Sequence, residues 1–142
     1  MEFITVEQFK EQPKEVQKVF LDWWKSNSSE VDLIGYVGKG EAYKESFPSL
    51  FRNIAINCFE IGVEIIPLFT EGQLRKFIED KAECKVMIEY TSCENIVIKI
   101  CIQDEVTGSL RYNRKLTFPN NKFDLINSYW KVACIIAKEE IV

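Results

Sequence analysis

The chain of 142 residues contains no histidine, and this absence excludes several kinds of site. Triads with a histidine base, histidine-containing zinc sites and histidine proton shuttles all require an imidazole. The five cysteines include no C-x-x-C pair, so zinc-finger spacing is absent as well. We therefore expect free and mostly buried thiols, no metal site and no cofactor.

Long hydrophobic runs and an N-terminal signal pattern are also missing. No apolar run reaches the ~18 residues that a membrane span requires, and Met1–Lys10 lacks the apolar core of a signal peptide. The formal net charge of -4 has the wrong sign for non-specific binding to phosphate backbones. We expect a cytoplasmic protein with no membrane partner, and the charge disfavours direct binding to nucleic acid.

Local signals predict most of the helices. Two T-x-x-Q capping boxes predict helices that begin after Thr5 and Thr70. Proline at the first helical position predicts helices over 14–26 and 48–61, and Asn120–Asn121 can cap a final helix over 122–139. Residues 28–48 are irregular, with a short strand at 31–37 followed by a glycine-rich turn, and we expect this region to be mobile.

Alternation of apolar and polar residues predicts the sheet. It runs through 85–91, 95–103 and 109–118, which is typical of a three-stranded antiparallel meander with one buried face. The final helix is apolar on two sides, so it is either central or at an interface, and both a monomer and a homodimer remain open. The predicted fold is a single α+β domain over 1–142, with N-terminal helices, the meander and a long C-terminal helix packed on the sheet.

The outer face of this meander is the first candidate site. Antiparallel sheets commonly have one solvated face, so its charges can serve solubility alone. An apolar centre with a charged border is also typical of a protein-binding patch. The non-core phase of the strands carries the cations Lys85, Lys99, Arg111 and Lys115 together with Met87, Val97 and Cys101.

Trp24 follows Trp23 in a predicted helix, and adjacent helical positions diverge by ~100°. Trp23 shares a stripe with Phe20, so Trp24 is expected at the rim, where tryptophan is a common hot-spot residue. The alternative is that a second helix covers Trp24. Tyr36, in the irregular region, is a further candidate contact.

Arg114 falls on the buried phase of its strand, and an unpaired buried guanidinium is costly. A bulge can re-aim it, it can reach an edge, or it can be paired inside a pocket. In the pocket interpretation Arg114 faces an anionic ligand, with Arg111 and Lys99 as further cations.

Catalytic constellations are not visible. Only Cys93 lies at a predicted turn, and no base accompanies it. The carboxylates of Glu79–Asp80 and of Asp104–Glu105 are adjacent in sequence, so they point apart on a helix or strand. We expect no enzymatic activity.

Three segments together carry a resemblance: Pro13–Lys25, Ile66–Lys81 and Tyr129–Glu140. They resemble small accessory proteins encoded in phages and prophages of low-GC anaerobic Gram-positive bacteria. The resemblance implies a protein that modulates host machinery, including bacterial defence systems.

Two functions follow as expectations. The first is a non-catalytic inhibitor that binds a host protein, such as a CRISPR effector. Its contact residues would be Trp24, Tyr36, Lys99, Arg111 and Lys115. The alternative is a sponge that sequesters a small anionic nucleotide signal through Arg114, Arg111 and Lys99.

Overall fold

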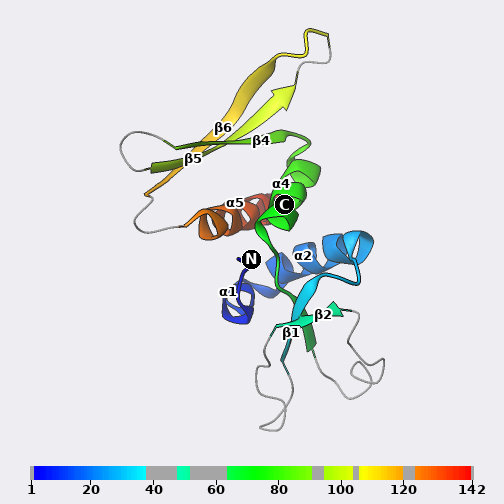
Figure 1. Ribbon diagram of the computed structural model, residues 1–142. Coiled ribbons are helices and arrows are strands. Elements are labelled where there is room, and N and C mark those ends of the chain that lie inside the picture. Colours follow the sequence, from blue (N-terminus) through cyan, green and yellow to red (C-terminus); the bar gives the residue numbers. More distant parts are fainter. Residues whose placement is uncertain are drawn as a thin grey trace. The chain divides into compact units, whose positions relative to one another are not determined.

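A computed structural model describes residues 2–37, 48–51, 64–90, 95–103, 106–119 and 124–141. Over these residues the chain forms four helices and six strands (Figure 1). Its contacts divide into two compact units, Phe3–Phe69 and Thr70–Val142, the second of which includes Met1–Glu2. The predicted α+β class is confirmed, and the prediction that 1–142 forms one domain stays a prediction.

The N-terminal unit begins with a helix set by its predicted capping box. The side chain of Thr5 accepts from the backbone N–H of Gln8 at 3.1 Å, and the side chain of Gln8 accepts from the N–H of Thr5 at 2.9 Å. These bonds satisfy amides that the first turn leaves without helical partners. Helix α1 spans Val6–Lys10, and α2 spans Lys14–Asn27 with Pro13 as its N-cap.

The short strand expected at 31–37 is confirmed, but the small antiparallel sheet to which it belongs was not predicted. It has the order β2-β1-β3, with β1 at Leu33–Val37, β2 at Ser49–Leu50 and β3 at Glu64–Pro67. The helix expected from Pro48 is wrong at its start, because Ser49–Leu50 pairs with β1. A strand of two residues has no measurable periodicity, so its identity comes from the partner strand. The remainder of that predicted helix and the glycine-rich turn lie outside the described residues.

Trp24 is buried, so its expected rim position is wrong. Its side chain is 7% exposed, and its ring makes an edge contact with Phe51 at a centroid distance of 5.1 Å. The indole Nε1–H donates to Asp32 Oδ2 at 2.9 Å, and the same oxygen accepts from the backbone N–H of Ser29 at 2.8 Å. Burial of tryptophan requires such a partner for its N–H. Trp24 therefore joins the end of α2 to the segment that leads into β1.

Removing Trp24 should consequently cost folding stability. We expect Trp24→Ala to lower the free energy of unfolding by ~3–5 kcal/mol, the range for large aromatic truncations. Trp24→Phe keeps most of the packing but removes the donor to Asp32, so we expect a loss of about 1 kcal/mol. Urea unfolding measures both values. Lys25→Ala, at the next and exposed position, is the control, and a loss as large as that of Trp24→Ala would contradict this assignment.

The C-terminal unit contains the predicted meander. Helix α4 spans Glu71–Ala82 behind a second capping box, formed by Thr70 and Gln73, and ends at Glu83 in the left-handed conformation. The strands β4 at Lys85–Tyr90, β5 at Asn95–Gln103 and β6 at Leu110–Pro119 follow in the order β4-β5-β6. The antiparallel meander is thus confirmed.

Helix α5 spans Leu125–Glu139 and packs on the sheet. Its N-cap is Asp124, whose Oδ1 accepts from the N–H of Asn127 at 2.9 Å, so the expected cap at Asn120–Asn121 is wrong. The helix packs on α4 and on β5 (Figure 1). Tyr129 and Trp130 diverge around its axis and are 0% and 6% exposed, so α5 is a central helix of this unit.

The central strand of the sheet is buried on both of its faces. On the helix-facing side, Ile98 and Ile100 are 0% and 1% exposed, while Val97 and Cys101 on the other side are 2% and 0% exposed.

Among the described helices, none is long and apolar enough to cross a membrane.

Candidate protein-binding surface

One row of residues crosses the sheet on the side away from α5. The strand register places Met87 of β4 opposite Lys99 of β5, and Lys99 opposite Lys115 of β6. We call these three residues the outer row. Met87 is 44% exposed and Lys115 is exposed, whereas the side chain of Lys99 is only 14% exposed. The row therefore presents a methionine and a lysine to solvent on either side of a mostly covered lysine.

Lys99 is neutralised within the sheet. Its ammonium forms an ion pair with the carboxylate of Glu89 on β4. The expected apolar centre of this face is wrong, because Val97 and Cys101 are buried. Small residues on a central strand lie between the side chains of both neighbouring strands. The exposed apolar contact is instead Met87, on the edge strand.

The hydrogen bond and the charge of Lys99 lower the pKa of Glu89. A carboxyl group whose folded-state pKa is lowered stabilises the fold above its unfolded-state pKa, and this contribution is lost as the pH falls through the folded-state value. We therefore expect the wild type to lose stability below about pH 4.3, the ordinary glutamate pKa, more steeply than Glu89→Gln. Urea unfolding from pH 3 to pH 7 measures this difference. Parallel pH profiles for the two proteins would contradict the assignment.

Arg114 keeps the helix-facing phase of β6, opposite Ile100, and its partly exposed side chain reaches an edge of the sheet, which was one of the three interpretations. The register pairs Ile100 with Arg114 and then Cys101 with Tyr112, which leaves Asn113 as the extra residue of β6. The guanidinium Nη1 of Arg114 lies 2.6 Å from Oε1 of Glu139, near the end of α5. An anion at Arg114 would therefore have to displace a carboxylate.

Two other candidate residues are described by their backbone alone. Tyr36 pairs with Ile65 between β1 and β3. Arg111 pairs with Ile102, beyond the bulge. The extra residue changes the phase of β6, so the register no longer groups Arg111 with Lys99 and Lys115. The side chains of Tyr36 and Arg111 lie outside the described part of the structure.

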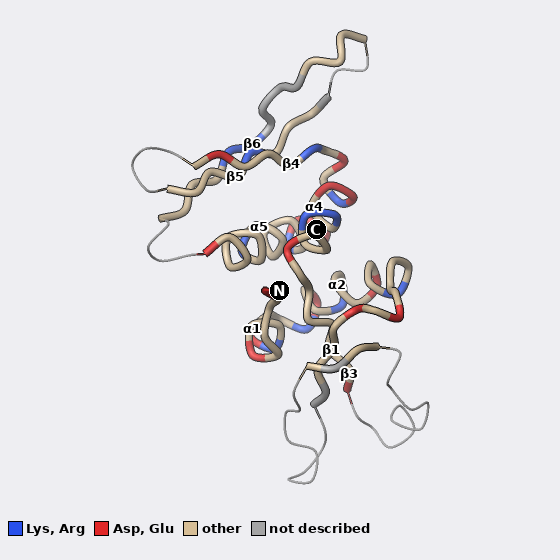
Figure 2. The backbone as a smooth tube through the Cα atoms, in the orientation of Figure 1, with Lys and Arg blue, Asp and Glu red and all other residues tan. Residues whose placement is uncertain are grey.

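A charged groove between α4 and β4 was not predicted as a site. It has a volume of about 920 Å³, and its lining includes Glu83, Cys84, Ile102 and Gly108. Its lining contains both basic and acidic residues, and Figure 2 shows positions of both charges along α4. The sequence signal is the i,i+4 spacing of opposite charges on α4.

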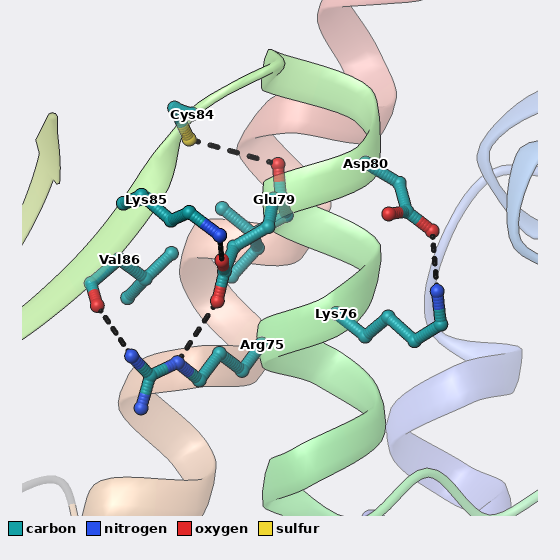
Figure 3. Close-up of polar contacts among 8 residues, drawn as sticks. Arg75, Lys76, Glu79, Asp80, Cys84, Lys85 and Val86 are labelled. Carbon is teal, nitrogen blue, oxygen red and sulfur yellow. Dashed lines mark hydrogen bonds and ion pairs between the residues drawn. The ribbon is translucent and has the colours of Figure 1, made fainter. Parts of the chain in front are cut away.

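The charges in this groove neutralise one another (Figure 3). Arg75 Nε lies 2.9 Å from Glu79 Oε1, and Lys85 Nζ lies 3.8 Å from Glu79 Oε2. Lys76 Nζ lies 3.3 Å from Asp80 Oδ2. Glu79 and Asp80 thus engage different cations, so these adjacent carboxylates do not form a catalytic pair.

The described cysteines are buried thiols. Burial raises the pKa of Cys84 to about 11 and that of Cys134 to about 12, and the nearby charge of Glu79 adds to the effect at Cys84. Both thiols stay protonated at neutral pH, and a protonated thiol is a poor nucleophile. Cys58 and Cys93 lie outside the described residues. Within the described ranges, no group of three or more cysteine, aspartate or glutamate residues could hold a metal ion.

Alkylation measures how strongly the fold protects these thiols. At pH 7.5 we expect iodoacetamide to modify Cys84 and Cys134 on the order of 100-fold more slowly in the native protein than in urea, because the thiolate fraction is small. Mass spectrometry of tryptic peptides reports each site separately. A cysteine that reacts at the same rate in both states would be accessible and ionised in the native fold, which would contradict its assignment as a buried thiol.

No protein-family model matches the chain, and comparisons with curated proteins and with solved structures gave no match.

Proposed function

We propose that this chain is a non-catalytic accessory protein of phage type that binds and inhibits a host protein in the bacterial cytoplasm, such as a component of a defence system. The observation that carries the proposal is the outer row, in which exposed Met87 and exposed Lys115 flank Lys99 on one sheet face. The resemblance of three segments to phage and prophage proteins supports the inhibitory role.

The chemistry of the outer row favours a protein as partner. Methionine is flexible and polarisable, and it adapts to irregular apolar surfaces. A neighbouring lysine supplies a polar rim and steers an acidic surface toward the contact. A small anion gains less here, because Lys99 and Arg114 already pair with Glu89 and Glu139.

The binding test uses charge reversal at Lys115. Tagged wild-type protein captures a partner from a lysate of a low-GC Gram-positive bacterium, and the purified partner is then titrated. We expect Lys115→Glu to weaken binding roughly tenfold or more, because like charges juxtaposed at an interface are strongly unfavourable. Lys18→Glu carries the same charge change at a side chain that is 73% exposed on α2, and it should bind as the wild type does.

Inhibition is measured with the same purified partner. Its activity should fall as wild-type protein is added, and Lys115→Glu should require a correspondingly higher concentration. Equal effects of Lys115→Glu and Lys18→Glu would remove the outer row from the interface. A retained nucleotide with no enriched protein would favour the sponge instead.

A further inference from the structure

Strand β4 is an edge of the C-terminal sheet, and much of it is exposed. Met87 and Tyr90 are 44% and 61% exposed. The side chains of Lys85 and Glu89 are 61% and 54% exposed. Edge strands with exposed apolar side chains are templates for pairing with another strand, and natural proteins usually block them.

The backbone of β4 offers hydrogen bonds on its open side. Arg75 Nη2 on α4 donates to the carbonyl oxygen of Val86 at 2.8 Å, so this carbonyl faces away from β5. Backbone groups alternate in direction along an antiparallel strand. The amides of Ile88 and Tyr90 therefore face the same open side. The carbonyl of Val86 retains a second lone pair for a further donor.

The sequence of β4 is complementary to itself in one antiparallel register. When two copies pair about Met87, Lys85 of each copy lies opposite Glu89 of the other, and the two Met87 side chains are neighbours. We propose that two copies of this chain associate through β4 in this register and form a continuous six-stranded sheet. Opposite charges directly across paired strands are favourable, and the register contains two such pairs.

Neighbouring symmetric registers lack this match. Pairing about Val86 places Lys85 opposite Met87, and pairing about Ile88 places Met87 opposite Glu89. Pairing about Glu89 places like charges opposite each other, which is unfavourable. Lys85 is available for the new contact, because its ammonium is 3.8 Å from Glu79, a carboxylate that Arg75 already engages at 2.9 Å.

Association through β4 is separate from the proposed function, because it occurs in the free protein without any host partner. In the paired arrangement the outer rows of both copies join, with the two methionines at the centre and lysines on either side. Strand pairing over six residues buries less than a standard interface, so the dimer should be reversible and concentration dependent.

Charge reversal tests the register. Sedimentation velocity of the purified protein over a range of concentrations should show a monomer–dimer equilibrium. Glu89→Lys should weaken association roughly tenfold or more, since both pairs become repulsive, and Lys85→Glu combined with Glu89→Lys should restore it. Both variants disturb the contact of residue 89 with Lys99 equally, so the recovery isolates the contact between copies. Glu30→Lys, at an exposed turn of the N-terminal unit, should associate as the wild type does.

A cysteine cross-link provides an independent test that needs no charge change. In the proposed register the two Met87 Cα atoms are about 4.5 Å apart, which lies within the range for a disulfide. Met87→Cys should therefore form a covalent dimer with diamide. Lys85→Cys should not exceed the wild-type level, because the two residues 85 are about 14 Å apart along the strands.

Each outcome decides the proposal. A monomer at all concentrations overturns it, and so does a dimer in which the two cysteine variants cross-link equally. Failure of the host-partner experiments leaves these measurements unaffected, since they use the purified protein alone.

Discussion

Burial of β5 on both faces is the constraint on which the C-terminal unit depends. Ile98 and Cys101 point to opposite sides of the sheet, and both are fully buried. Lys99 is the single charged residue within the buried stretch 96–101, and an unpaired charge in such a setting is costly. The ion pair with Glu89 therefore supplies the opposite charge that the burial of Lys99 requires. The acidity of Glu89 and the docking of β4 beside β5 follow from the same requirement.

The two edge strands of this sheet differ in how far they are blocked against pairing with a further strand. Strand β6 carries a bulge at Asn113, and Arg114 connects it to Glu139 on α5. Bulges and charged edge residues both discourage further pairing. On β4, within the described part of the chain, the side chain of Arg75 donates a hydrogen bond to one edge carbonyl, that of Val86. The asymmetry makes β4 the more open edge, while the outer row connects both edges across Lys99.

The sequence predicted those features whose signals are local. Both capping boxes and the meander are confirmed, because three successive runs of alternation leave little choice of structure. The solvated outer face was misjudged at its centre, where Val97 and Cys101 extend a nearly continuous apolar run typical of a central strand. Strands β2 and β3 are short and depend on β1 for their pairing. The cover over Trp24 depends on Asp32 and Phe51, and the neutralisation of Arg114 depends on Glu139, so neither contact can be read from a local pattern.

Because of the bulge in β6, the number of residues, and not their type, decides which face of the sheet the segment before Asn113 has in its register. Residues on the Phe118 side of Asn113 keep the phase that the core requires, whereas Leu110–Tyr112 have the phase that one extra residue gives them. Deletion of a single codon at this point would reverse that short segment and leave the core positions of β6 untouched. Insertions and deletions of one residue, usually ruinous inside a strand, are here a one-step route by which the tip of the hairpin can diversify.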